Sequence, residues 1–186
     1  MPSLSEAERQ NLLLLARKAI EEAVTRRQLP ETIPQEGIFG EHRGVFVTLH
    51  VRGGLRGCIG TTESQETLGE AVVRCAASAA LHDPRFPPMR SDELRKLQIG
   101  ISLLSAMRAI TLEEIEIGRH GLVVSDSTHR GLLLPQVAAE HGMSREQFLA
   151  ETCRKAGLPR EAWRSASTQL EAFTCEVFEE GRSEEE

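Results

Sequence analysis

The sequence contains no tyrosine and one tryptophan, and its 186 residues carry a formal net charge of −6. It has no apolar run near the roughly 20 residues that a membrane-spanning helix needs, which argues against that class of protein. An acidic chain does not attract phosphate backbones through its overall field, so nucleic-acid binding would need a local basic patch. That patch would require four arginines to converge on one face: Arg52, Arg56, Arg85 and Arg90.

Metal and redox motifs are missing as well. The four cysteines form no Cys-x-x-Cys pair, no histidine pair has ligand spacing, and no phosphate-binding loop occurs. We therefore predict neither a metal nor a cofactor. The first residues lack the basic and then apolar order of a secretion signal, which predicts a cytoplasmic protein. In that reducing compartment the thiols are expected to be free, namely Cys58, Cys75, Cys153 and Cys175.

The sequence does contain clear helix-like and strand-like patterns. A capping box, Ser5 with Glu8, opens an amphipathic helix that ends before Pro30. Further helices are predicted at 67–81, 91–96, 136–141 and 144–157, and strands at 45–51, 55–59, 99–103, 122–124, 132–134 and 170–177. Because hairpins rather than strict βαβ units separate the strands, we expect an α+β fold with an antiparallel sheet.

The segment Leu55–Gly60 is the first candidate for chemistry. Residues two apart in a strand share a face, so Arg56 and Cys58 would point the same way. A neighbouring guanidinium favours the thiolate form of Cys58, which is the nucleophilic form. Gly57 and Gly60 flank the thiol and would let a ligand or another backbone come close. This interpretation predicts a functional thiol.

The turn before this strand supports a different interpretation of Cys58. Gly53-Gly54 is predicted to form a two-residue turn, because both glycines accept positive φ. That turn pairs Leu49 with Cys58 and places the thiol on the apolar face, where a cysteine acts as a small core residue. The pattern leaves both interpretations open, since a shift of one residue reverses the face.

The proline-rich segment His82–Pro88 is the second candidate. Its three prolines exclude regular structure and hold the ionisable residues in a fixed arrangement. In a functional interpretation, His82 carries protons, Asp83 orients it and Arg85 binds an anion. In a structural interpretation, Asp83 braces the turn, Arg85 pairs with a surface carboxylate and Phe86 fills the core.

Four segments occur in an order and spacing that resemble one known family: Leu55-Arg56-Gly57-Cys58-Ile59-Gly60, Asp83-Pro84-Arg85-Phe86-Pro87, Gly131-Leu132-Leu133-Leu134-Pro135-Gln136-Val137-Ala138 and Cys153-Arg154-Lys155-Ala156-Gly157-Leu158. Together they resemble the AMMECR domain family, whose bacterial and archaeal members are called AmmeMemoRadiSam system protein A. The resemblance runs from the first helix to Phe178. The chain departs from its relatives after Ser105, where Ala106–Ala109 replaces a segment that often contains prolines and a carboxylate.

The resemblance implies an antiparallel α+β fold in two unequal parts. The larger subdomain would span about 1–110 and 165–180, and a smaller inserted α+β subdomain about 111–164, with 181–186 as an acidic tail. It implies a site at the hairpin with a lining from the proline-rich segment: Arg56, Gly57, Cys58, Ile59 and Gly60, then Asp83, Arg85 and Phe86. It also implies two kinds of partner, Memo-like proteins, which look like non-haem-iron dioxygenases, and radical S-adenosylmethionine proteins.

Neither the residues nor the resemblance fixes a reaction, so two functions are carried forward. In the first, the protein is an enzyme or carrier of a small molecule, with Cys58 as nucleophile, Arg56 as activator and His82 as proton carrier. In the second, it is a non-catalytic adaptor, recognised by a buried Cys58 and an exposed apolar patch at Phe86 and Met89. Nucleic-acid binding is a third function, and the net charge argues against it.

Overall fold

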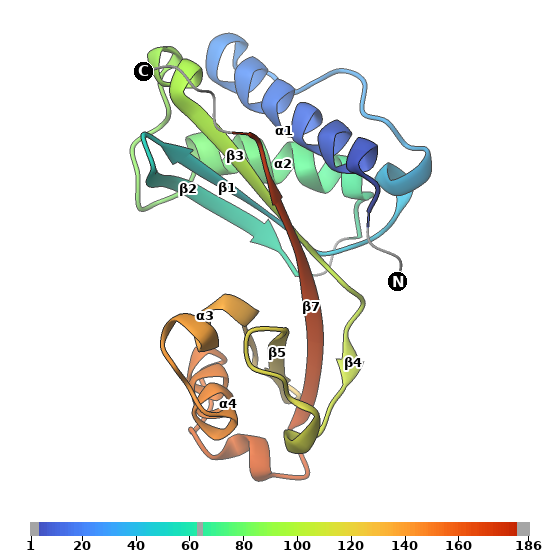
Figure 1. The fold of residues 1–186 in the computed structure, drawn as a ribbon, viewed down its shortest axis with the longest axis vertical. Helices are drawn as coiled ribbons and strands as arrows, with labels where there is room; N and C mark the ends of the chain where they lie inside the picture. The colour runs from blue at the N-terminus through green and yellow to red at the C-terminus, as the bar shows by residue number, and fades with distance from the viewer. Residues whose placement is uncertain (1–3, 63–64, 182–186) are drawn as a thin grey trace. The chain divides into compact units, whose positions relative to one another are not determined.

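A computed structural model of the protein describes residues 4–62 and 65–181. The chain has a mixed α+β fold and divides into two compact units, Met1–Leu104 with Glu176–Glu186, and Ser105–Cys175. Both are drawn in Figure 1. None of the helices in the described residues combines the length and the apolar character needed to span a bilayer.

The first unit places two helices on one face of an antiparallel sheet (Figure 1). Within this unit the strand order is β2-β1-β3, followed by the end of β7. Its elements are α1 (Glu6–Arg26), η1 (Gly37–Gly40), β1 (Val45–Val51), β2 (Gly54–Thr61), α2 (Leu68–Leu81), η2 (Ser91–Lys96), β3 (Leu97–Leu104) and the last residues of β7 (Gln169–Glu179).

Alternation along β1 separates the two faces of this sheet. Val45, Val47 and Leu49 are fully buried and pack against α1 and α2. The residues between them, Phe46, Thr48 and His50, are half-buried and lie on the opposite face. A side chain's position in this alternation therefore decides whether it joins the core.

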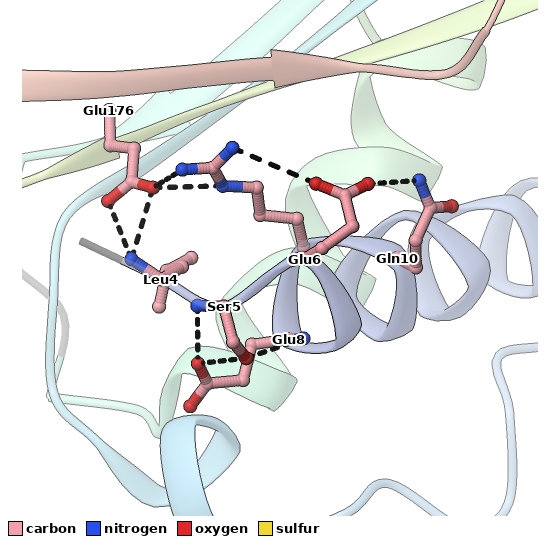
Figure 2. A network of polar contacts seen from close by, with 7 residues as sticks. Leu4, Ser5, Glu6, Glu8, Gln10 and Glu176 are labelled. Carbon is pink, nitrogen blue, oxygen red and sulfur yellow. Dashed lines mark hydrogen bonds and ion pairs between the residues drawn. The ribbon is translucent and has the colours of Figure 1, made fainter.

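The start of α1 is fixed by its cap and by β7. Glu8 accepts a hydrogen bond from the Ser5 backbone N–H at 2.8 Å, and the Ser5 hydroxyl accepts one from the Glu8 N–H at 3.3 Å. The predicted capping box is therefore confirmed. Figure 2 shows Glu176 of β7 beside this end of the helix, where it accepts the Leu4 N–H at 3.1 Å and the Arg9 Nε–H at 3.0 Å. Both ends of the described chain thus belong to the first unit.

The second unit has its own strands, helices and core. Its elements are β4 (Arg108–Ala109), η3 (Leu112–Glu114), β5 (His120–Ser125), β6 (Arg130–Leu133), α3 (Pro135–Glu140), α4 (Arg145–Lys155), η4 (Ala162–Arg164) and the first residues of β7. β5 pairs with both β6 and β7, and Phe148 and Leu149 of α4 are fully buried in the core. The bounds of this unit differ from the expected 111–164, since Arg108–Ala109 pairs with Glu171 and Ala172 of β7.

The predicted helices and strands are present with shifts of a few residues at their ends. The predicted segment 91–96 is a 3-10 helix, η2, and β4 is a short strand that the sequence pattern did not indicate. The α+β class with antiparallel pairing is confirmed.

Candidate functional site

The β1–β2 hairpin turns one residue earlier than the sequence predicts. Arg52 and Gly53 are the turn residues, with φ of 53° and 78°, and Gly54 is already in β2, paired with Val51. Positive φ at both central residues is the geometry that matches the twist of a tight hairpin. The predicted Gly53-Gly54 turn is therefore wrong by one position, because Arg52 adopts the left-handed conformation that the prediction assigned to glycine.

A β-bulge follows and changes the register again. His50 pairs with Leu55 but Leu49 pairs with Gly57, so Arg56 is an extra residue on β2. Past the bulge, Cys58 is opposite Thr48, which lies on the face away from the helices. The interpretation of Cys58 as a core residue paired with Leu49 is therefore wrong, because the bulge at Arg56 shifts the pairing by one residue and so reverses the face of Cys58.

Cys58 is half-buried, and its thiol has a polar neighbour. The Thr48 hydroxyl oxygen lies 3.3 Å from Cys58 Sγ, within hydrogen-bonding distance. When the thiol is ionised, the hydroxyl is the donor of this pair. The next residue, Ile59, is opposite Val47 and packs against the core, as the alternation of the strand requires.

The proline-rich segment covers the outer edge of β2 at Cys58. Asp83 Oδ2 accepts the Cys58 backbone N–H at 2.9 Å, and Arg85 Nη2 donates to the Cys58 carbonyl at 3.3 Å. β2 is the outermost strand of the first unit, so these groups have no neighbouring strand on that side. Asp83 and Arg85 thus take the place of a further strand at this one residue.

Asp83 and Arg85 also bind each other. Arg85 donates from Nε at 2.9 Å, from Nη2 at 2.7 Å and from its backbone N–H at 3.1 Å. These bonds, with the one from Cys58, hold the pKa of Asp83 far below its usual range. The pKa of the Arg85 guanidinium is raised mainly by its hydrogen bonds to Asp83, and the adjacent Cys58 side chain raises it further. The cation beside the Cys58 thiol is therefore Arg85.

Arg56 has a different partner. Its Nε and Nη2 donate to the Glu93 carboxylate at 2.7 and 3.0 Å, and this bidentate contact lowers the pKa of Glu93. Its third nitrogen, Nη1, is buried and meets no hydrogen-bond partner among the residues that the structure describes. The activating role predicted for Arg56 stays a prediction, and its charge is already matched by Glu93.

The two glycines of the motif make room for packing. A Cβ on Gly57 would collide with the Ala79 carbonyl of α2, and one on Gly60 would collide with the Phe46 ring. The expected approach of another backbone is therefore present at Gly57, where α2 lies against β2.

The remaining residues of the proline-rich segment lie next to Asp83 and Arg85 in the chain. His82 is exposed at the end of α2, where its N–H donates to the Ser78 carbonyl, and Asp83 is engaged by Cys58 and Arg85. The Arg85 guanidinium lies 5.5 Å from the centre of the half-buried Phe86 ring. Met89 is buried, so it forms no exposed patch with Phe86. In residues 4–62 and 65–181, no cluster of three potential metal ligands occurs.

Sequence reasoning missed Thr48 and Glu93. Thr48 could have been found as the small polar residue between the buried positions 47 and 49, whereas the pairing of Glu93 with Arg56, 37 residues away, leaves no signal in the sequence. The thiols, by contrast, are all free, as expected. Cys75 and Cys153 are buried. Cys175 is half-buried, and burial raises its pKa to about 12.

Known proteins match almost the whole chain. A family model described as AMMECR1 matches residues 13–178. Protein Mbar_A1807 of Methanosarcina barkeri is 43% identical, with 95% of this chain and 92% of that protein covered. Protein PF1979 of Pyrococcus furiosus is also 43% identical, with 91% and 86% covered. The crystal structure of uncharacterized protein PH0010 from Pyrococcus horikoshii has a TM-score of 0.84 and 39% identity, and the match covers 95% of this chain and 93% of that one.

Proposed function

This chain belongs to the AMMECR1 family, as its motifs predicted, and we propose that it binds a small molecule at the Leu55–Gly60 hairpin and presents the Cys58 thiol to it. One observation carries the proposal. Cys58 is half-buried on the face away from the helices, with the Thr48 hydroxyl 3.3 Å from its thiol and the Arg85 guanidinium beside it. A hydroxyl donor and a cation next to a thiol both favour its nucleophilic form.

In this proposal the motif residues divide into two groups. Cys58 is the reacting group, with Arg85 and Thr48 beside it, and Asp83 holds Arg85 in place. Gly57 and Gly60 serve the packing of α2 and Phe46 that shapes the hairpin. The proton-carrying role of His82 remains a prediction, supported by its exposure next to Asp83 in the chain.

The adaptor function has less support. Its mark would be an exposed apolar patch at Phe86 and Met89, and Met89 is buried. Nucleic-acid binding has less support again, because three of its four arginines are paired with carboxylates: Arg56 with Glu93, Arg85 with Asp83 and Arg90 with Asp92. Memo-like and radical S-adenosylmethionine partners remain predictions from the family resemblance.

The test is the rate at which iodoacetamide alkylates each cysteine in the folded protein, followed by mass spectrometry at pH 7.5. Cys175 is the matched control because it is also half-buried but has a pKa of about 12. We expect Cys58 to react at least tenfold faster than Cys175, and Cys75 and Cys153 to react only on unfolding. Arg85→Gln should slow Cys58 more than Arg56→Gln does. The proposal is rejected if Cys58 stays unmodified until the protein unfolds.

A further inference from the structure

The Arg85 side chain is held on one edge and open on the other. A guanidinium has five N–H donors. Three of them are engaged: Nε and Nη2 donate to Asp83, and Nη2 also donates to the Cys58 carbonyl. The hydrogen bonds to Asp83 and to the Cys58 carbonyl use only Nε and Nη2, the Cys58 side chain lies beside the guanidinium, and the Arg85 side chain is 54% exposed, which leaves Nη1 open. The guanidinium therefore offers two N–H donors to solvent next to the thiol.

Asp83 makes this donor rigid. Its carboxylate accepts four N–H groups, one from Cys58 and three from Arg85, and its side chain is 2% exposed. A ligand that binds Nη1 does not have to order a flexible side chain, which removes part of the usual entropic cost.

We infer that the ligand of this site carries an anionic oxygen group, a carboxylate or a phosphate, which binds Arg85 Nη1 while the rest of the ligand lies against Cys58 Sγ. This inference rests on the proposed function and adds the class of ligand to it. Oxygen anions are the acceptors with which a guanidinium N–H forms its strongest, charge-assisted hydrogen bonds. Neither neighbouring arginine offers the same donor, because Arg56 is 13% exposed with Nη1 buried, and Arg90 is held by the exposed Asp92 rather than by a buried carboxylate that binds Cys58.

Two alkylating reagents of nearly equal size test the inference. Iodoacetate carries a carboxylate and iodoacetamide a neutral amide, and each is attacked by the Cys58 thiolate, which forms an S–C bond and releases iodide. The readout is the ratio of the two rates at Cys58, divided by the same ratio at Cys58 in urea-unfolded protein. We expect roughly a fivefold preference for iodoacetate in the folded protein, the size of one exposed charge-assisted contact.

Variants and competitors locate the preference. Arg85→Gln should bring the normalised ratio back to about one, whereas the control Arg90→Gln, in the same loop, should leave it unchanged. In the unaltered protein, phosphate or acetate at constant ionic strength should slow iodoacetate and leave iodoacetamide unaffected. If phosphate competes more strongly than acetate, the ligand carries a phosphate group. If acetate competes more strongly, the ligand carries a carboxylate.

Failure of this inference differs from failure of the proposed function. If Cys58 reacts readily with iodoacetamide but shows no preference for iodoacetate, or if neither anion competes, the anionic ligand is rejected while the functional thiol stands. If Cys58 reacts with neither reagent before unfolding, both are rejected. Because the competition arms use the unaltered protein, the inference can still be rejected if Arg85→Gln does not fold.

Discussion

The outer strands of the two units, β2 and β6, meet a helix in the same way. Gly57 of β2 leaves room for the Ala79 carbonyl of α2, and Gly131 of β6 leaves room for the backbone at Ala156, just after α4. In each case a side chain would push the helix away from the strand. In both units a glycine on the outer strand therefore allows close contact with a neighbouring backbone. The two units differ in which groups bind the aspartate near the hairpin.

Asp83 and Asp126 are both low-pKa carboxylates that accept backbone N–H groups, but over different distances in the chain. Asp126 binds the N–H groups of Thr128 and His129 in its own turn, and these bonds lower its pKa to about 2. Asp83 binds an N–H on β2, 25 residues away, and a guanidinium as well. The first arrangement shapes a loop, whereas the second joins a loop to a strand and leaves an arginine fixed beside a thiol.

The largest expected effect is from Asp83→Asn. The substitution keeps one acceptor oxygen but removes the charge that binds Arg85 and leaves buried donors without good partners. We expect the free energy of unfolding to fall by about 3 kcal/mol, measured by urea denaturation. Asp126→Asn is the matched control and should cost less than half as much, because an asparagine can accept the same turn bonds. Equal losses would mean that the long-range bonds of Asp83 add nothing.

Gly57→Ala is expected to have the next largest effect. Its Cβ would meet the Ala79 carbonyl, so α2 must move away from β2 or the strand must bend, at a cost of roughly 2 kcal/mol. Gly131→Ala should be similar in the second unit. Gly54→Ala is the control on β2, since its Cβ would have only one neighbour, at 3.7 Å. If Gly57→Ala unfolds at the same urea concentration as Gly54→Ala, the close approach of α2 is not required.

The two aspartates also predict an acid dependence of stability. Each has a folded pKa below the ordinary 3.8, so its contribution is complete above about pH 4 and is lost as the pH falls toward the folded value. For Asp126 that loss of stability falls between pH 3.8, its ordinary pKa, and about pH 2, its pKa in the folded protein. The loss from Asp83 continues to lower pH, so Asp83→Asn and Asp126→Asn should flatten the fall in stability similarly down to about pH 2, and below that pH only Asp83→Asn should flatten it further. Urea unfolding midpoints measured from pH 5 to below pH 2 test this expectation, and equal flattening by both variants below pH 2 would contradict it.

The sequence was sufficient for most of the fold because its local signals agree with one another. Capping residues at Ser5 and Thr67 coincide with the starts of α1 and α2, and the apolar alternation of 45–51 matches the burial of β1. The register of the hairpin could not be derived in the same way. It depends on an arginine, Arg52, with positive φ, which moves the turn and changes the cross-strand partner by two residues, and on a bulge at Arg56, which changes it by one and so reverses the face.

The residues that we propose as a site could be grouped from the sequence, but their contacts could not be derived from it. Motif matching brought Cys58, Asp83 and Arg85 together, and they are in contact. Which of Arg56 and Arg85 lies beside the thiol depends on the carboxylate that each one binds. Arg56 binds Glu93, far from it in the chain. Pairing between residues far apart in the chain leaves no periodic signal in a single sequence.

The smallest expected effect concerns Thr48 and sharpens the contrast between two half-buried thiols. Cys58 has a hydroxyl at 3.3 Å, whereas at Cys175, on β7, burial is what raises the pKa to about 12. Thr48→Val keeps the shape of the side chain and removes the donor, so Cys58 alkylation by iodoacetamide should slow roughly threefold. Thr48→Ser should restore the rate, and Cys175 should be unaffected by either change. If the valine variant reacts as fast as the unaltered protein, the hydroxyl does not stabilise the thiolate, and the reactivity of Cys58 would have to come from Arg85 alone.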